Sequence, residues 1–172
     1  MKNQVLVIMG SDSDWHVMEN AVVILEQFAV NYEVHVASAH RTTERALALA
    51  RQADHQGFDV IIAGAGAAAH LPGVLAAVTP LPVIGVPINA TALQGVDALY
   101  AMVQMPSGIP VATVAIDGAK NAALLALQIL GVKDHAFRKK ICEYKSQLAE
   151  EVSLKDKKIQ ELISQRQEKE NA

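Results

Sequence analysis

Short apolar runs alternate with helix-like stretches along most of this chain. Runs rich in β-branched residues occupy positions 4–9, 32–37, 58–63, 82–86 and 110–116. After each run, apolar residues recur at helical spacing, over 15–28, 43–56, 70–78, 93–104 and 119–130. This alternation predicts βαβ units, in which right-handed helical crossovers join parallel strands.

The predicted fold class is α/β, a three-layer αβα sandwich of flavodoxin-like type. Its five-stranded parallel sheet is expected in the order 2-1-3-4-5. Hydrophobic residues make up 51% of the chain and aromatic residues only 4%, which suits a buried parallel sheet. We expect this domain over residues 1–132, with Gly57 and Gly131 ending two of its helices.

Residues 133–172 differ from the rest because they are rich in Lys, Glu and Gln and contain neither Gly nor Pro. They predict one long C-terminal helix. Its apolar side chains recur at helical spacing and form a stripe: Phe137, Ile141, Tyr144, Leu148 and Val152. The stripe packs either on the chain's own body or on a neighbouring subunit, and we favour the second interpretation. Beyond Val152 the pattern thins, and we expect that end to fray or protrude.

Composition excludes several classes of function. Ten of the 15 Lys and Arg residues lie in 133–172, so the first 132 residues are acidic and unsuited to binding nucleic acid. No apolar run is long enough to span a membrane and the N-terminus lacks a signal-peptide layout, so we expect no membrane partner and a cytoplasmic location. The single cysteine, Cys142, excludes an internal disulfide framework and a cysteine-based metal cluster.

Three loops that follow predicted strands carry most of the reactive side chains. They are 10–14 (GSDSD), 38–42 (SAHRT) and 63–73 (AGAGAAAHLPG). Because the carboxyl ends of parallel strands meet at one edge of a sheet, we expect these loops to converge there. A small phosphorylated metabolite would suit the groups that these loops supply, which are hydroxyls, carboxylates, histidine, arginine and exposed backbone amides.

The first of these loops has two interpretations. Ser11, Ser13 and Asp14 stand at a predicted helix start, where Ser13 or Asp14 could cap the helix. Hydroxyls and amides at a helix N-terminus also favour phosphate, and a nearby carboxylate can accept hydrogen bonds from ribose hydroxyls. One loop can serve both purposes.

Among six histidines, His40 is the strongest candidate for catalysis, because it follows a strand and stands beside Arg41. His70, at a predicted helix start, comes second. The others lie within predicted helices or strands: His16, His35, His55 and His135. No second histidine or acid stands at ligand spacing, so no metal site is expected. An imidazole that titrates near neutral pH suits successive acid and base steps.

The small residues 64–69 match the dinucleotide fingerprint G-x-G-x-x-A. The match follows the third predicted strand rather than the first, and no acidic residue lies about 20 positions downstream to bind a ribose. We therefore reject a dinucleotide site. The small residues indicate either close packing of helix on sheet or a tight loop whose amides contact a ligand.

These loops, with 85–87 (GVP), 95–97 (GVD), 104–106 (QMP) and 121–123 (NAA), resemble the N5-carboxyaminoimidazole ribonucleotide mutase family of purine biosynthesis. The resemblance implies that the 1–132 domain is catalytic and isomerises that ribonucleotide to 4-carboxy-5-aminoimidazole ribonucleotide. It implies no ATP, metal, biotin or redox cofactor. It also implies a homo-octamer with active sites at subunit contacts.

The resemblance also implies roles for single residues. His40 matches the family's catalytic histidine, and Ser11, Asp14 and Arg41 match substrate-binding positions, with Ser13 and Ser38 as helpers. The loop around the imidazole and carboxylate matches Ala65, Gly66, Ala67, His70 and Leu71. Two residues depart from the pattern: Thr43 replaces a frequent proline, and Ala67 replaces a usual glycine and adds a methyl group that could narrow the pocket.

This chemistry needs one imidazole that first gives and then takes a proton, in a pocket that traps carbon dioxide away from water. The nearest alternative is the related carboxylase, which uses free carbon dioxide and aminoimidazole ribonucleotide. In that branch the arginine is often lysine and the Ala-His-Leu-Pro loop is altered, so Arg41 and the intact 70–72 segment favour the mutase.

Two further alternatives share the expected fold. A receiver module would need an aspartate at the end of the third strand, where Ala63 and Gly64 stand. A flavin-binding electron carrier would need ring-stacking aromatic residues near the loops, and few aromatics are present. Neither fits this sequence.

Overall fold

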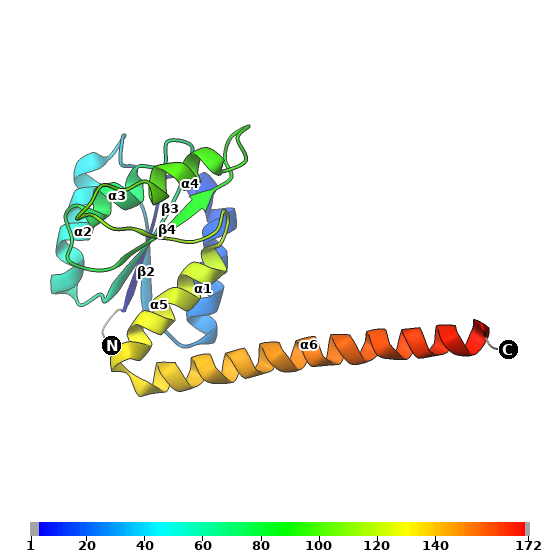
Figure 1. Cartoon of the computed structure of the whole chain (residues 1–172). Coiled ribbons are helices and arrows are strands. Elements are labelled where there is room, and N and C mark those ends of the chain that lie inside the picture. The colour runs from blue at the N-terminus through cyan, green and yellow to red at the C-terminus, as the bar shows by residue number, and fades with distance from the viewer. Residues whose placement is uncertain (1–3, 171–172) are drawn as a thin grey trace.

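The computed structural model describes residues 4–170 and contains a five-stranded parallel sheet in the order β2-β1-β3-β4-β5 (Figure 1). The predicted fold class and strand order are therefore confirmed. The elements, in chain order, are β1 (Val5–Met9), η1 (Asp12–Asp14), α1 (Trp15–Gln27), β2 (Tyr32–Val36), α2 (Thr43–Gln56), β3 (Val60–Gly66), α3 (Leu71–Ala76), β4 (Val83–Ile88), α4 (Val96–Val103), β5 (Ala112–Thr113), α5 (Ala119–Lys133) and α6 (His135–Glu170).

The central strands β1, β3 and β4 are apolar along almost their whole length because helices cover both faces of the sheet. Alternate side chains of β1 enter different cores: Val5 and Val7 face one layer, Leu6 and Ile8 the other. At the carboxyl end of β1, Met9 pairs with Val36 of β2 and with Gly64 of β3. The chain segments that follow these strands therefore emerge at the same edge.

Helices α1 and α5 pack on one face of the sheet, and α2, α3 and α4 pack on the other (Figure 1). Small residues bring these layers close together. A Cβ on Gly64 would clash with the side chain of Met18 in α1, so a larger residue there would require Met18 to move. Gly64 thus has the close-packing role that was one interpretation of the glycine-alanine segment.

Several element boundaries differ from the sequence expectation. The third strand extends through Ala65 and Gly66, which were expected in a loop, since alanine and glycine carry no strand signal of their own. Only Ala112 and Thr113 of the fifth predicted run pair with the sheet. The run begins with Pro110, which has no N–H to donate, and this limits pairing at its start.

The two glycines expected to end helices behave differently. Gly57 ends α2 in the left-handed conformation at φ 89°, as predicted. The expectation for Gly131 was wrong, because α5 continues to Lys133. A Cβ at Gly131 would lie 3.2 Å from the backbone nitrogen of Arg138, so this glycine allows α6 to turn closely against the end of α5.

Helix α6 begins on the body and then projects far from it (Figure 1). Phe137 and Ile141 are buried in the core formed with α1 and α5, and the ring of Tyr144 packs edge-on against Phe28 at 5.6 Å between centroids. Lys140 Nζ donates a hydrogen bond to the carbonyl of Phe28 at the end of α1 (2.6 Å). The start of the stripe thus packs on the chain's own body, while packing of the rest of the stripe on a neighbouring subunit stays a prediction.

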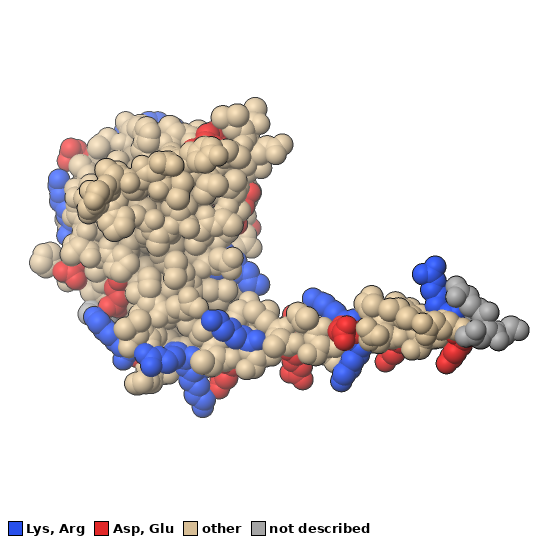
Figure 2. Space-filling model, in the orientation of Figure 1, with Lys and Arg blue, Asp and Glu red and all other residues tan. Residues whose placement is uncertain are grey.

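Charged side chains are sparse on the visible face of the body and frequent along α6 (Figure 2). The segment 60–116, which includes α3, β4 and α4, contains a single formally charged residue, Asp97. No helix within residues 4–170 combines the length and apolarity needed to cross a membrane.

Candidate active site

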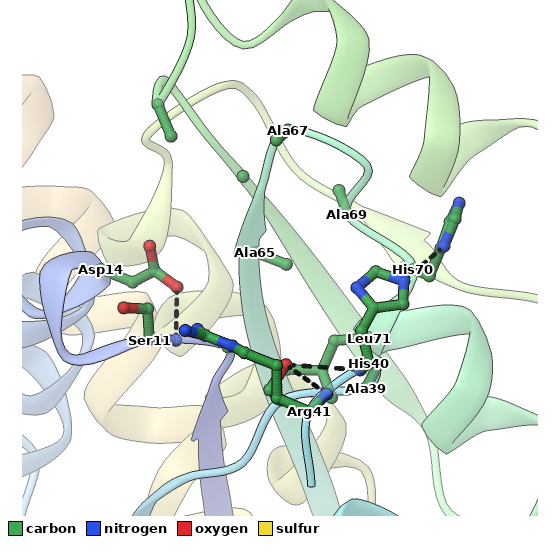
Figure 3. A pocket seen from close by; sticks show the side chains of 14 residues that line it. Ser11, Asp14, Ala39, His40, Arg41, Ala65, Ala67, Ala69, His70 and Leu71 are labelled. Atoms are coloured by element: carbon green, nitrogen blue, oxygen red, sulfur yellow. Dashed lines mark hydrogen bonds between the residues drawn. The ribbon is translucent and has the colours of Figure 1, made fainter. Parts of the chain in front are cut away.

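A cavity of about 310 Å³ opens at the carboxyl edge of the sheet, where the loops after β1, β2, β3 and β4 meet (Figure 3). This is the place that the topology predicts for a ligand. Its lining residues are Gly10, Ser11, Asp14, Ser38, Ala39, His40, Arg41, Ala65, Gly66, Ala67, Ala69, His70, Leu71 and Ala90.

The loop after β1 is held by its own polar side chains. Ser11 Oγ accepts a hydrogen bond from the backbone N–H of Ser13 (3.3 Å), and Asp14 Oδ2 accepts one from the backbone N–H of Ser11 (3.0 Å). This reciprocal arrangement is a capping box at the start of η1, with Ser11 as the N-cap residue. The expectation that Ser13 or Asp14 caps the helix was wrong, because Asp14 is the N-cap residue of α1 but makes no side-chain capping bond there. Ser13 does not line the cavity, but its hydroxyl donates to Ser11 Oγ (2.9 Å).

Asp14 is a buried carboxylic acid beside an open cavity, with only 6% of its surface exposed. Burial raises the pKa of Asp14 above its ordinary value of 3.8, because the charged form loses solvation. The N–H of Ser11 stabilises the carboxylate and opposes that rise of the pKa. A ligand hydroxyl that donates a hydrogen bond to Asp14 would stabilise its carboxylate form, which burial destabilises.

The loop after β2 is organised around Ser38. Its Oγ accepts hydrogen bonds from the backbone N–H groups of His40 (3.3 Å) and Arg41 (3.2 Å), and its own N–H donates to Thr42 Oγ1 (2.9 Å). These side-chain hydrogen bonds take the place of the strand-to-strand backbone bonds that end with β2. They fix the backbone of this loop and hence the directions of the His40 and Arg41 side chains. In Figure 3 the Arg41 side chain extends toward the loop of Ser11 and Asp14.

His40 and His70 meet at the mouth of the cavity. Nε2 of His40 lies 2.8 Å from Nδ1 of His70, and the two rings stand edge to face at 5.0 Å between centroids. One ring donates and the other accepts, according to the tautomers. His70 is the N-cap residue of α3, yet its side chain makes no capping bond there, which leaves the ring free to contact His40.

The segment after β3 forms the apolar wall of the cavity with strained alanines. Ala67 and Ala69 have positive φ angles of 53° and 33°, a region that costs a non-glycine residue about 1–2 kcal/mol. The N–H of Ala69 donates to the carbonyl of Gly66 and closes the turn (3.0 Å). Gly66 itself is required by a close approach, since a Cβ there would lie 2.5 Å from that of Ala90.

A second cavity, of about 440 Å³, adjoins the first on the side of β2. Four residues line both, Gly10, Ser11, Ser38 and Arg41, and the second adds Asp12, Val36 and Thr42. Arg41 is the only lysine or arginine among the lining residues of either cavity. An anionic group of a ligand would therefore be attracted to the boundary between the two spaces.

The structure brings together ten of the eleven residues singled out from the sequence, all except Ser13. It adds Gly10, Ala39, Ala69 and Ala90, which sequence reasoning missed. Ala90 had a usable signal, because it follows β4 and so must lie at the same edge as the other loops. The other three are small residues next to residues that were chosen. Within residues 4–170, no group of three or more His, Cys, Asp or Glu side chains is placed to hold a metal ion.

Comparison with known proteins assigns the family. The sequence profile of the AIR carboxylase family matches residues 4–151, which is most of the chain. The chain belongs to the AIR carboxylase family. The match includes all the loops that line the cavity and stops inside α6, so the last part of that helix lies beyond the region that defines the family.

Similar members of the AIR carboxylase family have been named for their activity. The chain is 58% identical to N5-carboxyaminoimidazole ribonucleotide mutase of Pyrococcus horikoshii, over 91% of this chain and 88% of that protein. It is 51% identical to phosphoribosylaminoimidazole carboxylase of Saccharomyces cerevisiae, over 93% of this chain but only 28% of that protein. The crystal structure of Treponema denticola PurE has the same fold, with a TM-score of 0.82 and 29% identity over 90% of this chain and 97% of that one.

Proposed function

We propose that this enzyme converts N5-carboxyaminoimidazole ribonucleotide to 4-carboxy-5-aminoimidazole ribonucleotide. The observation that carries the proposal is the pair of imidazoles, His40 and His70, at the mouth of a cavity that has an arginine on one side and an alanine wall on the other. The mutase names of similar proteins, such as the Pyrococcus horikoshii enzyme, support the same reaction.

The substrate is oriented by the distribution of charge around the cavity. Its phosphate lies near Arg41, with the hydroxyls of Ser11, Ser13 and Ser38 as further donors. Its ribose lies beside the buried acid of Asp14, which accepts hydrogen bonds from hydroxyl groups. These contacts place the imidazole and its carboxyl group against the wall that includes Ala65, Gly66, Ala67, His70 and Leu71.

His40 acts as general acid and then as general base. It gives a proton to the carbamate nitrogen of the substrate, and the bond from this nitrogen to the carboxyl carbon breaks to release carbon dioxide. Carbon C4 of the aminoimidazole ring attacks the trapped carbon dioxide and forms the new carbon–carbon bond. His40 then takes the proton from C4, so atoms and charge balance and the imidazole is ready for another cycle.

The small apolar wall protects the intermediate. Carbon dioxide has no net dipole and few hydrogen-bonding demands, so methyl groups and bare backbone can hold it without binding it strongly. The same surface excludes water, which would otherwise compete for the intermediate. We propose that no ATP, metal, biotin or redox cofactor takes part, since the reaction is an isomerisation with no net redox change.

The proposal extends to assembly and location. The enzyme assembles as a homo-octamer, and this is supported by the apolar stripe of α6, whose Leu148 and Val152 are 41% and 63% exposed. It acts in the cytoplasm, where soluble ribonucleotide intermediates are available. The octamer rests on the family resemblance together with the exposed stripe.

The deciding assay follows fresh N5-carboxyaminoimidazole ribonucleotide by ultraviolet absorbance, without ATP, metal or added bicarbonate. Rapid conversion to the C4-carboxylated product supports the mutase. The carboxylase is the second candidate, because the matching part of the Saccharomyces cerevisiae protein is 51% identical to this chain. Turnover from aminoimidazole ribonucleotide and carbon dioxide alone would favour that alternative, and no turnover in either assay would contradict both.

A further inference from the structure

Asp97, in the first turn of α4, has a buried carboxyl oxygen that no donor reaches. Within the part of the chain that the structure describes, its Oδ1 is the one buried side-chain nitrogen or oxygen without a hydrogen-bond partner. Its other oxygen, Oδ2, accepts a hydrogen bond from Thr91 Oγ1 (2.8 Å). A buried acceptor without a donor destabilises a fold, so the bond to Thr91 has to offer something in return.

The bond between Thr91 and Asp97 holds the segment 89–95, which joins β4 to α4 (Figure 1). Thr91 Oγ1 also accepts a hydrogen bond from the N–H of Leu93 (3.1 Å), and the carbonyl of Thr91 accepts one from the N–H of Gln94 (3.0 Å). The Thr91 hydroxyl therefore organises the second half of the segment and ties it to the helix that follows.

The start of the same segment is attached to another part of the chain. The N–H of Asn89 donates to Asp117 Oδ1 (2.9 Å), while the N–H of Asp117 donates to the carbonyl of Pro87 (2.8 Å). Ala90 lies between this attachment and Thr91, and it is the residue of the segment that lines the cavity. Two carboxyl groups therefore restrict the position of Ala90, one on each side.

Ala90 supports the segment that follows β3. A Cβ on Gly66 would lie 2.5 Å from that of Ala90, so the Ala90 methyl group lies directly against the Gly66 backbone. The carbonyl of Gly66 closes the turn that contains Ala67 at φ 53°. If Ala90 moved away, this turn would lose its support. In the proposed reaction the same turn belongs to the wall that keeps carbon dioxide from water.

We propose that Asp97 is a positioning residue, which holds Ala90 against Gly66 through Thr91 and so keeps the wall of the cavity closed. Neither Asp97 nor Thr91 lines the cavity, so both act through Ala90. A carboxyl group is also favourable in the first turn of a helix, which helps to keep Asp97 in its half-buried place. The effect on carbon dioxide rests on the proposed function, whereas the coupling of the two segments does not.

The first test measures backbone hydrogen exchange by mass spectrometry in the full-length chain and needs no turnover. We expect Thr91→Val, which keeps the shape but lacks the hydroxyl, to speed exchange by roughly ten-fold both in 89–95 and in 66–69. Thr91→Ser keeps a hydroxyl and should restore wild-type exchange. The matched control is Thr113→Val, which removes another half-buried hydroxyl that bonds only to backbone carbonyls outside both segments. Faster exchange in 89–95 alone would overturn the coupling.

A double-mutant cycle tests whether Asp97 acts through Thr91. Asp97→Ala should speed exchange in 66–69 as Thr91→Val does, and the double variant should be no faster than either single one, because both changes break the same bond. Additive effects of the two changes would overturn the shared role.

The second test measures how well carbon dioxide is retained during turnover. Unlabelled substrate is converted in buffer that contains isotopically labelled bicarbonate, and mass spectrometry gives the fraction of product that carries the label. We expect Thr91→Val to raise this fraction at least about three-fold over wild type, because a loosened wall lets carbon dioxide exchange with solvent. Thr91→Ser and Thr113→Val should match the wild type.

The two tests separate this inference from the proposed reaction. A labelled fraction that Thr91→Val leaves unchanged would overturn the role in retention, even if the wild type forms the product. A wild-type protein that forms no product would overturn the reaction, while faster exchange in both segments of Thr91→Val would still support the positioning of Ala90 by Asp97.

Discussion

Nε2 of His40 and Nδ1 of His70 are 2.8 Å apart, although thirty positions separate the two residues in the chain. The contact depends on the sheet order, since His40 follows β2 and His70 follows β3, and both strands pair with β1. One ring therefore donates a hydrogen bond to the other. This relationship allows the roles of the two histidines to be separated by experiment.

His40→Asn should bind the ribonucleotide but lose turnover by about 10²-fold or more, because an amide cannot transfer the proton. Binding is measured by calorimetry with the stable product, and turnover by absorbance. His55→Asn is the matched control, since His55 lies in the last turn of α2, away from the cavity. Near-normal turnover of His40→Asn would remove this residue from the mechanism.

His70→Leu should slow turnover less than His40→Asn does. It removes one hydrogen bond to the His40 ring, worth about 1 kcal/mol, and so we expect a loss of about five-fold. His70→Gln, which keeps a polar group able to bond to His40, should recover part of that loss. If both variants were as inactive as His40→Asn, His70 would itself have to transfer a proton.

Arg41→Ala should weaken binding chiefly through the phosphate group. We expect KM to rise by roughly ten-fold or more, since a charge-assisted contact contributes about 1.5–3 kcal/mol. The measurement compares the ribonucleotide with its dephosphorylated nucleoside in the wild type and the variant. An equal loss of affinity for both ligands would contradict the phosphate role.

Asp14→Asn should change how stability depends on pH. The raised pKa of Asp14 means that the folded protein binds this proton more tightly than the unfolded chain, so its contribution to stability is present below pH 3.8 and is lost as pH rises through the folded pKa. Asn does not titrate, so the variant does not lose this contribution. In urea unfolding, the free energy of unfolding of Asp14→Asn should therefore rise relative to that of the wild type as pH increases from 3.8 toward neutrality. A constant difference would show that Asp14 titrates normally.

Ala67→Gly should relieve backbone strain at φ 53°. The left-handed conformation costs alanine about 1–2 kcal/mol, while glycine adds about 0.5–1 kcal/mol of unfolded-state entropy, so stability should stay level or rise by up to about 1.5 kcal/mol. Ala68→Gly is the control, because Ala68 is exposed, does not line the cavity and is not at positive φ. It should lower the melting temperature, and a similar fall for Ala67→Gly would contradict strain at this position.

Sequence reasoning predicted the architecture because it depends on features that are local in the chain. Apolar runs, helical periodicity and Gly57 each specify their own neighbourhood, and the parallel topology then collects the loops at one edge. This was enough to choose His40, Arg41 and Ser11 as neighbours. Their catalytic and binding roles stay predictions until the variants are measured.

The parts that sequence reasoning missed depend on tertiary contacts. Glycine is typical of helix ends, yet α5 continues past Gly131 to Lys133. A Cβ at Gly131 would lie 3.2 Å from the backbone nitrogen of Arg138, a contact that the local sequence does not predict. Ala65 and Gly66 join β3 because β4 pairs with them, and no property of the two residues alone predicts that pairing. The division at residue 132 stays a prediction, since α6 shares a core with α1 and α5.

The close contact between Gly131 and Arg138 lies near the start of α6, so it affects the direction in which this long helix leaves the body. Helix α6 has 36 residues and so extends about 54 Å from the corner that Gly131 allows. A tilt of about 10° at this corner would move the far end of the helix by roughly 9 Å, nearly the spacing of two packed helices. A single methyl group added at Gly131 would thus have its largest effect at the far end of α6, where the displacement is greatest.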